Sequence, residues 1–569
     1  MSLLAELKRR HVFRIAAAYV VGAWIAIQVA ATIAPLLGMP DWVPRLVVLL
    51  SILGFPIAVI LAWIYDLGER GIERTAPTTS LEPTAPEAPT TQPVSPARSA
   101  SDPVTSLAVL PIDEAGSDDA LADGLTEALI TDLARTTQLK VISRSSVARF
   151  RRTTESPRSI AEALNVDALV TGTVRRSGDR IRISVELMDA KSERVLWADR
   201  FDRELEDVLR LQDDVARAIA REVGAYATSD AQAVGQAALP RKVVPEVYLL
   251  DLRGRRMMES RAEAGFRAAL GCFEQALDLD PTYGPSYLGV ARAHNMLANY
   301  GLEAPRQAHA RVRSAIERAL TMGADEAEAQ GELAQMVWQF DFNWADADRA
   351  YRQALEIAPR NARLWYWHGT MLAVGGRFDA ALESLARSEE LDPLSPMIPA
   401  NRGWIHYFAR RYDQSVATLR EVLALNPELA PAHWFLGMAR VAKGDLDGAI
   451  ESYGAAIART GRISRLLGYL GHACGRAQRR DEAQALLQEL RERAKEAYVP
   501  PYFLALVLAG LEDRDGALNE LEAAHAQGDT MLRDVFVDES FDTLRDEPRF
   551  QRLLARMHLP YDPSGSAAG

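Results

Sequence analysis

The 569-residue sequence predicts a multidomain protein with a two-helix transmembrane hairpin, a small α/β domain and an all-α superhelix of stacked helix pairs. Three observations predict these parts. Two long uncharged runs lie near the N-terminus, strand-like alternation of apolar and polar residues follows, and small residues recur every 34 positions in the second half. A chain of this length exceeds what one hydrophobic core usually holds, so several structural units are expected.

The first part, residues 1–74, is predicted to be a membrane anchor. Residues 15–37 and 46–65 carry no charge, and each run is long enough as a helix to cross a hydrocarbon core of about 30 Å. Basic residues precede the first run and follow the second, whereas the turn between them holds only Arg45. This distribution predicts a multi-pass protein with both ends in the cytoplasm. Because Arg outnumbers Lys and Ala is abundant, the expected location is a bacterial inner membrane, with a periplasmic placement of the soluble domains less favoured.

Small residues recur every four positions along the first apolar run. This spacing lets another helix approach closely, so it is a candidate seam for a homodimer. Packing against the second run, or the general abundance of Ala, explains the same pattern. The residues concerned are Ala18, Gly22, Ala26, Ala30 and Ala34.

A linker and an α/β domain are predicted next. Residues 75–105 are rich in Pro, Thr and Ala, and such a segment buries too little apolar area to fold, so it is expected to be a disordered linker. Within residues 106–225, a short apolar run at 107–112 and alternation at 181–187 predict strands. Leucines at four-residue spacing over 121–133 predict a helix between these strands.

Four strings in this region resemble the TolB N-terminal-like domain. The resemblance implies an adaptor or regulatory module of the kind that precedes repeat arrays in bacterial signalling proteins, with no catalytic residues to transfer. The residues flanking the two apolar runs likewise resemble two-helix anchors found ahead of such domains. The four strings are LAVLP at 107–111, ADGLTE at 122–127, GTVRRSGD at 172–179 and WADRFD at 197–202.

Two carboxylates of this region were weighed as a catalytic pair. Asp123 and Glu127 lie four residues apart on one predicted helix and share a face. Acid/base catalysis also needs a pocket and a partner for the substrate, and the neighbouring sequence indicates neither. The favoured interpretation is a helix-start motif with solvated carboxylates.

The 34-residue period predicts tetratricopeptide (TPR) repeats. Small residues recur in two series and let two antiparallel helices cross closely, and large residues four positions after the second small series fill the adjacent core. The second small series runs Ala347, Ala381, Ser415, Ala449, Ala483 and Ala517. About eight repeats are expected in residues 240–530, followed by a helical cap at 531–560, which covers the last exposed face, and a disordered tail at 561–569. The first small series runs Gly369, Gly403, Gly437, Gly471 and Ala505, and the large series runs Tyr351, Leu385, Leu419, Tyr453, Leu487 and Leu521.

The concave face of the array is the predicted site for a protein or peptide ligand. By resemblance to the repeat family, certain positions of each first helix face the groove, and here they are mostly aromatic. The Lys and Asn residues of the family's carboxylate clamp are missing, so an apolar or aromatic-bearing peptide is expected rather than an acidic chain end. Alternatively, several of these rings pack within their own repeat. The candidate residues are Tyr366, Trp404, Tyr407, Phe408, Trp434, Met438 and Tyr502, with Arg363, Arg465 and Arg476 at the edge.

Composition limits the other classes of function. The net charge is -12 with no basic stripe, so nucleic acid is not an expected partner. Scattered histidines and two isolated cysteines predict no metal or cofactor, and phosphate-loop and nucleophile-elbow motifs are missing, so no enzyme is expected. The sequence therefore predicts a non-catalytic, inner-membrane-anchored TPR scaffold that contacts the bilayer through two helices. The alternative is a ligand-responsive signalling protein whose α/β domain senses a small effector.

Overall fold

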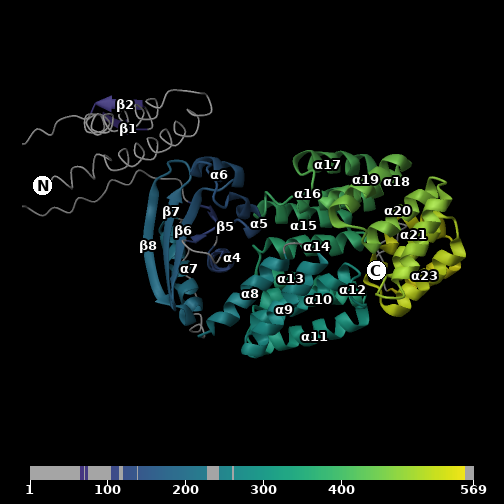
Figure 1. The fold of residues 1–569 in the computed structure, drawn as a ribbon, viewed down its shortest axis with the longest axis horizontal. Coiled ribbons are helices and arrows are strands. Elements are labelled where there is room, and N and C mark those ends of the chain that lie inside the picture. Colours follow the sequence, from purple (N-terminus) through teal and green to yellow (C-terminus); the bar gives the residue numbers. More distant parts are fainter. Residues whose placement is uncertain are drawn as a thin grey trace, which may run out of the picture. The chain divides into compact units, whose positions relative to one another are not determined.

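The computed structural model describes residues 65–68, 71–74, 104–114, 119–137, 139–226, 242–258 and 262–557. The chain divides into two compact units, Met1–Ser99 and Ala100–Gly569. In the first unit the described residues form one antiparallel pair of strands, β1 (Tyr65–Gly68) and β2 (Gly71–Arg74). All other described elements belong to the second unit (Figure 1).

The predicted transmembrane hairpin is corrected by this structure. Among the described residues, no helix combines the length and apolarity that crossing a bilayer requires. This finding contradicts the hairpin, the multi-pass inner-membrane location and the bilayer contact. The predicted spans 15–37 and 46–65 lie outside the described residues except for Tyr65, which begins strand β1 instead of ending a helix. The prediction was wrong because it rested on the length and apolarity of two runs and on the basic residues around them, and these features do not by themselves establish a membrane span.

Three further predictions concern residues that lie wholly or mostly outside those that the structure describes. The candidate dimer seam at Ala18 to Ala34 lies outside the described residues. The predicted linker 75–105 lies outside them except for residues 104 and 105, and the tail 561–569 lies wholly outside.

A mixed sheet forms the core of the α/β domain. The strand order is β5-β3-β6-β7-β8, with β4 pairing β6. Strand β3 runs parallel to β5 and β6, whereas β6, β7 and β8 form an antiparallel meander. The strands are β3 (Ser106–Val109), β4 (Asp113–Glu114), β5 (Lys140–Val141), β6 (Ala168–Ser177), β7 (Arg180–Asp189) and β8 (Val195–Glu204).

Helices pack against this sheet because their apolar faces match its buried face. Helices α4 (Asp119–Thr136) and α7 (Val208–Tyr226) bury their leucines and valines together with the apolar residues of β3, β6 and β7. The alternation predicted for residues 181–187 places Ile181 and Ile183 in this core. Short helices connect the remaining elements, namely α5 (Arg144–Val147), η1 (Ala148–Phe150), α6 (Pro157–Leu164) and η2 (Leu205–Asp207).

Eight antiparallel helix pairs follow within the described residues. They stack in chain order from α8 at the α/β domain to α23 near the C-terminus (Figure 1). The pairs are α8 (Pro245–Met258) and α9 (Glu263–Leu279); α10 (Gly284–Asn299) and α11 (Pro305–Thr321); α12 (Glu326–Phe340) and α13 (Trp344–Ile357); α14 (Ala362–Val374) and α15 (Phe378–Leu391); α16 (Met397–Phe408) and α17 (Tyr412–Leu425); α18 (Ala430–Ala442) and α19 (Leu446–Thr460); α20 (Ser464–Arg476) and α21 (Arg480–Arg493); α22 (Pro501–Gly510) and α23 (Arg514–Gln527).

The 34-residue glycine series marks the closest approach of the two helices in a pair. A Cβ atom added at Gly403 would lie 2.6 Å from Leu419 Cγ, and one at Gly437 would lie 2.5 Å from Tyr453 Cε1. Leu419 and Tyr453 belong to the large series of the same period. The two series are therefore the two sides of one contact, repeated along the array.

The array closes on itself after these eight pairs. A guanidinium nitrogen of Arg306 in α11 donates a hydrogen bond to the carbonyl of Ala526 in α23. A Cβ atom at Gly301, which follows α10, would lie 2.7 Å from Pro500 Cγ just before α22. The second pair thus meets the eighth, although more than two hundred residues separate them in sequence.

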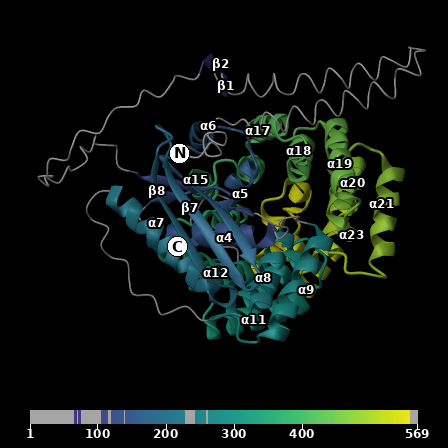
Figure 2. The ribbon, with the colours of Figure 1, turned by 60° about the vertical axis from the view of Figure 1, so that its left-hand side comes forward.

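The chain turns inward after α23. Two 3₁₀ helices, η3 (Thr530–Phe536) and η4 (Glu539–Leu544), precede a final helix, α24 (Pro548–Arg556). Figure 2 shows these yellow residues among the green and teal helices of the array. Helix α24 packs on α23, where Arg549 pairs with Glu522 at 2.8 Å, whereas η3 and η4 contact the first helices of several repeats.

Candidate protein-interaction groove

The inner surface of the array is occupied by the chain's own residues 529–544, which we call the plug segment. Contacts to it come from α10, α12, α14 and α22, the first helices of their pairs. The apolar side chains of the segment are buried, including Leu532, Val535 and Phe541 at 0% exposure. Tyr502 of α22 packs edge-on against the ring of Phe541 with centroids 5.2 Å apart.

Three tyrosine hydroxyls converge on one carboxylate of the plug segment. Tyr407 donates to Asp538 Oδ1 at 2.8 Å, and Tyr502 and Tyr469 donate to Oδ2 at 2.8 and 3.0 Å. The backbone N–H of Ser540 adds a fourth hydrogen bond at 3.0 Å. Asp538 is completely buried, so these four donors replace the water that an ionised carboxylate otherwise requires. The tyrosines come from α16, α20 and α22, so three different repeats share one acceptor.

The start of the plug segment is anchored by a buried arginine. Arg533 donates to Asn299 Oδ1 at 2.7 Å, and its guanidinium carbon lies 5.0 Å from the ring centre of Trp338. Thr530 donates to the carbonyl of Ala298 at 3.1 Å. These contacts fasten the segment to α10 and α12, whereas the partners of Asp538 come from α16, α20 and α22.

The end of the plug segment is held by two ion pairs, one largely buried and one partly exposed. Arg476 lies 3.4 Å from Glu539, and Arg410 lies 2.7 Å from Asp542. Burial raises the pKa of Glu539 despite the attraction of Arg476. Since Asp542 is 41% exposed, its pair contributes little to stability.

Burial shifts the titration of the groups in and around the groove. It raises the pKa of Tyr407, Tyr469 and Tyr502 well above the ordinary value, so all three remain protonated and act as donors. Burial also raises the pKa of Asp529 to about 6, against hydrogen bonds from the backbone N–H groups of Met531 and Tyr502. It raises the pKa of Asp534 to about 6 as well, against the attraction of Arg533.

The stability of the protein should therefore depend on Asp534 in a pH-specific way. Its folded pKa of about 6 lies above the ordinary aspartate pKa of 3.8, so the folded state binds more protons between these values. The contribution of Asp534 to stability is present at low pH and is lost as pH rises through about 6. We expect Asp534→Asn to gain stability relative to the wild type by up to about 3 kcal/mol between pH 4 and pH 7.5.

Urea unfolding at a series of pH values, followed by circular dichroism, measures this difference. Asp546→Asn is the matched control, because Asp546 is exposed in the turn that precedes α24. His472, whose pKa burial and Arg476 lower to about 4, opposes this trend but is present in every variant and cancels. A difference between Asp534→Asn and wild type that stays constant with pH would contradict the prediction.

Four of the ten predicted groove residues contact the plug segment or its anchor. Tyr407 and Tyr502 bind Asp538, and Arg476 pairs with Glu539. Arg465 lies 3.5 Å from the sulfur of Met531 and also donates to the carbonyl of Asn299. All four residues lie on the first helices of their pairs.

The other predicted residues lie in contacts between or within repeats. Trp404 packs against Phe408 with centroids 4.3 Å apart and against Phe435 of the next first helix at 5.7 Å. Met438 is buried. Trp434 is half-buried beneath Arg465, and half-buried Tyr366 stacks edge-on with Trp367. Arg363 belongs to the ion-pair cluster described next.

Sequence reasoning missed Tyr469, Asn299, Trp338 and the whole plug segment as parts of the site. Tyr469 stands one position away from those assigned to the groove. Asp538 carried the best available signal, because it lies in the run Phe536 to Phe541 among apolar residues, where an acid needs a partner. The sequence of this run does not indicate which helices supply the partners of Asp538.

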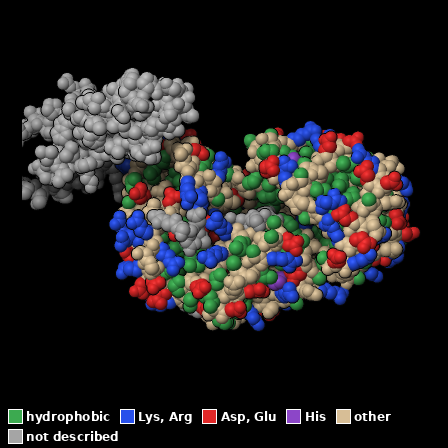
Figure 3. All heavy atoms as spheres, viewed as in Figure 1, with side chains coloured by type: hydrophobic (Ala, Val, Ile, Leu, Met, Phe, Trp, Pro, Cys, Tyr) green, Lys and Arg blue, Asp and Glu red, His purple; other side chains and the backbone are tan. Residues whose placement is uncertain are grey.

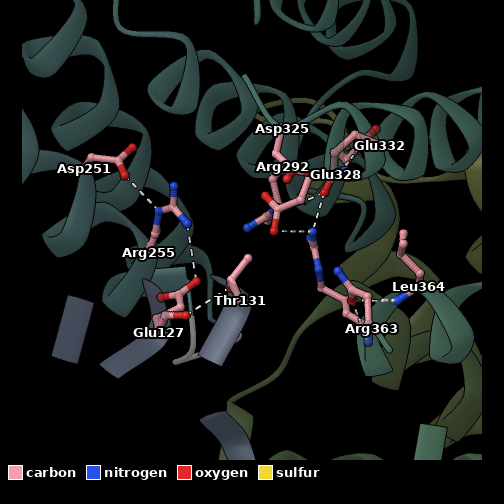
Figure 4. Close-up of polar contacts among 12 residues, drawn as sticks. Glu127, Thr131, Asp251, Arg255, Arg292, Asp325, Glu328, Glu332, Arg363 and Leu364 are labelled. Carbon is pink, nitrogen blue, oxygen red and sulfur yellow. Dashed lines mark hydrogen bonds and ion pairs between the residues drawn. The ribbon is translucent and has the colours of Figure 1, made fainter. Parts of the chain in front are cut away.

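A buried ion-pair cluster lies on the same first helices, nearer the α/β domain (Figure 4). Glu332 of α12 accepts from Arg292 Nε at 2.9 Å, from an Nη of Arg363 at 2.9 Å and from Asn295 at 3.1 Å. Burial opposes the ionisation of Glu328, but Arg292, Arg363 and Arg255 outweigh it and lower its pKa to about 2. The cluster ties α10, α12 and α14 together through charges that are shielded from solvent.

The two carboxylates that were weighed as a catalytic pair join the α/β domain to the array. Glu127 accepts from Arg255 of α8 at 3.3 Å, and Arg255 also binds Asp251 at 2.8 Å (Figure 4). Asp123 is buried and pairs with Arg256 of α8 at 3.7 Å. Both carboxylates are therefore ion-paired, not solvated as the sequence suggested.

A second contact strengthens this joint. Asp392, at the end of α15, accepts from the hydroxyl of Ser146 at 2.6 Å and also from Ser145. The backbone N–H of Ser143 donates to the carbonyl of Leu391 at 2.8 Å. The α/β domain and the array are therefore fixed to each other at two separate places.

Comparisons with known proteins match both halves of this unit. A family model described as HilA/YgeH-like transcriptional regulator, second domain, matches residues 103–218. A model described as tetratricopeptide repeat matches residues 343–396 and 401–462. The second match confirms the predicted TPR repeats. The TolB N-terminal-like resemblance is not shown by these comparisons, which match the α/β region to the HilA/YgeH-like description instead.

Two curated relatives share a part of the chain. The protein named Putative adenylate cyclase 3 of Rhizobium meliloti is 34% identical over 196 residues, which cover 34% of this chain and 32% of that protein. Transcriptional regulator HilA of Salmonella typhimurium is 20% identical over 180 residues, or 31% of this chain and 32% of that protein. The chain thus spans about a third of the length of these relatives.

Among solved structures, PilF of Pseudomonas aeruginosa is 21% identical, with a TM-score of 0.27 over 36% of this chain and 90% of that chain. A likeness of this size carries no functional argument. The fold and the family model together define a protein with an array of tetratricopeptide repeats joined to a small α/β domain.

Proposed function

We propose that this chain is a non-catalytic scaffold that binds protein partners on the inner surface of its repeat array. One observation carries the proposal: the surface already holds a stretch of polypeptide through three tyrosines on the carboxylate of Asp538. TPR repeats are generally protein-binding modules, and peptide recognition in grooves reuses the contacts made by internal segments.

The plug segment indicates the chemistry of the partner. Its central acid, Asp538, lies between the apolar residues Val535 and Phe541, and Glu539 and Asp542 follow toward the rim. A partner segment of the same type, apolar with a central carboxylate, would make the same contacts after displacing the chain's own residues. This proposal changes the expected ligand from a purely apolar or aromatic peptide to one that carries an acid.

Catalysis is not part of the proposal. The word cyclase belongs to the name of a relative of which this chain spans about a third. The two carboxylates considered as a catalytic pair, Asp123 and Glu127, are engaged with arginines. Their ion pairs with α8 join the α/β domain to the repeat array, and this structural role requires no substrate.

A labelled peptide tests the proposal directly. The probe is a fluorescent synthetic peptide with the sequence of residues 529–545, added to the full chain carrying Asp538→Asn, which loosens the internal segment. We expect the peptide to bind this variant at least about tenfold more tightly than it binds the wild-type chain, whose groove is filled. Fluorescence anisotropy measures both affinities.

Two controls make the result specific. Adding Tyr407→Phe and Tyr469→Phe to the Asp538→Asn chain removes two donors and should weaken peptide binding about tenfold or more. A peptide in which the acid equivalent to Asp538 is Asn should bind as weakly. The inner surface would be excluded as the recognition site if the Asp538→Asn chain, with or without the two tyrosine substitutions, bound both peptides with equal affinity and with unchanged helical content.

A regulatory role is the second candidate. The match of residues 103–218 to a domain of transcriptional regulators favours it, as does the rigid joint that Arg255 makes with Glu127. If the α/β domain controls the array, Arg255→Ala should change the peptide affinity of the Asp538→Asn chain at least about fivefold. A plain scaffold predicts no change in the same titration.

A further inference from the structure

Strand β8 is the free edge of the sheet in the α/β domain. Among the described strands it pairs only with β7, and Figure 1 shows it at the outer side of the domain. The strand is ten residues long, and the exposed fraction of Val195 at its start reaches 45%. A long edge strand exposes a row of backbone donors and acceptors that a second strand can use.

The register shows which backbone groups of β8 face outward. Ile183 lies opposite Phe201, and Val185 lies opposite Asp199. The backbone N–H of Leu205 donates to Asp179, so in an antiparallel ladder residues 203, 201 and 199 also point toward β7. Residues 198, 200, 202 and 204 therefore direct their backbone groups away from the sheet. Local contacts agree, because the N–H of Arg200 bonds the side chain of Asp199, and Arg203 bonds the carbonyl of Asp202.

The side chains of this edge are complementary to themselves. Residues 199–203 read Asp-Arg-Phe-Asp-Arg. When two such strands run antiparallel about Phe201, Asp199 faces Arg203 of the other copy, and Arg200 faces Asp202. Phe201 then meets its own counterpart at the centre, and its ring is half-buried against the core of the domain. Opposite charges and paired aromatic rings are the cross-strand partners that stabilise a ladder.

The backbone and the side chains select the same register. Pairing about Phe201 matches the outward groups of residue 200 with those of residue 202, which gives about eight hydrogen bonds over residues 198–204. Pairing about Asp199 would oppose two aspartates, and pairing about Arg203 would oppose two arginines. Charged side chains on an edge strand usually repel a second strand. The charges of residues 199–203 instead attract a second copy of the strand, in this alignment.

We propose that two copies of this chain associate through β8, joining their sheets into one continuous antiparallel sheet centred on Phe201. The proposal is independent of the groove, because β8 lies in the α/β domain and the plug segment lies in the array. Asp202 already pairs with Arg180 and Arg182, and Arg203 pairs with Asp214; these ion pairs are partly exposed and can share their partners with a second copy. Strand addition of this kind is a common mode of protein association.

Charge reversal and its rescue test the register. Sedimentation equilibrium of the full chain should show a monomer–dimer equilibrium. Asp199→Arg replaces two attractive pairs by two repulsive ones and should raise the dimer dissociation constant about tenfold or more. The double variant Asp199→Arg with Arg203→Asp restores opposite charges and should return to within about threefold of wild type. A monomeric wild-type chain, or a double variant no better than the single one, would overturn the proposal.

A crosslink provides a second test that does not depend on charge. In a chain with Cys272→Ser, the substitution Phe201→Cys places two thiols opposite each other across the axis, within disulfide range. Mild oxidation should convert most of this variant into a covalent dimer. Val195→Cys is the control, because residue 195 is exposed but faces residue 207 of the other copy in this register. Equal crosslinking of both variants, or of neither, would overturn the proposed register.

Discussion

Replacing Asp538 with alanine should lower the free energy of unfolding by about 4 kcal/mol, because three buried tyrosine hydroxyls lose their acceptor at once. The effect should be larger than that of any one tyrosine, since Tyr469→Phe removes one donor and leaves the other two tyrosines and the backbone N–H of Ser540 in place. Urea unfolding followed by circular dichroism measures the loss. Hydrogen exchange should show faster opening of residues 529–544 in the same variant.

Asp542→Ala is the matched control for this prediction. Asp542 belongs to the same plug segment and is paired with Arg410, but its side chain is 41% exposed. Its removal should cost less than about 1 kcal/mol. If Asp538→Ala and Asp542→Ala destabilised the chain equally, the convergence of tyrosines would not be what holds the segment.

Replacing Glu332 with alanine should cost about 3 kcal/mol, because the largely buried Arg292 and the one-third exposed Arg363 would lose the carboxylate that they share. Only 3% of the Glu332 side chain is exposed. Glu328 remains nearby, but it already pairs with Arg292 at 3.1 Å. Chemical unfolding of the full chain reports this loss, and the helical content at low urea should be preserved.

The control for Glu332 lies on the same helix. Glu326 is exposed in the first turn of α12, and Glu326→Ala should change stability by less than about 1 kcal/mol. Glu332→Gln keeps the shape of the side chain and one acceptor, so its loss of stability should lie between those of Glu332→Ala and Glu326→Ala. A Glu332→Ala chain as stable as Glu326→Ala would show that the cluster contributes no net stabilisation.

The repeat architecture could be predicted because the contacts that cause it are local in sequence and recur in repeat after repeat. Gly403 with Leu419, and Gly437 with Tyr453, are each separated by sixteen residues within a single helix pair. A spacing that small leaves a periodic trace along the sequence. The alternation of Ile181 and Ile183 with polar residues predicted a strand for the same reason, because its cause is also local in sequence.

The site was only half predictable because its contacts are distant in sequence. Tyr407 and Asp538 are 131 residues apart, and Thr530 lies 232 residues from Ala298. No periodicity links these positions, so only the closure of the array brings them together. The aromatic residues of the first helices signalled a crowded inner face, but Trp404 shows that the same signal marks packing between repeats.

Long-range closure also sets an order of events during synthesis. Each helix pair can form against its predecessor as soon as it is made, whereas the contacts of Thr530 with Ala298 and of Arg306 with Ala526 must wait for nearly the whole chain. A ribosome-bound intermediate therefore displays the tyrosine-lined surface uncovered until residues 529–544 emerge. Chains that terminate early should keep that surface exposed, which makes them the natural targets of chaperones and proteases.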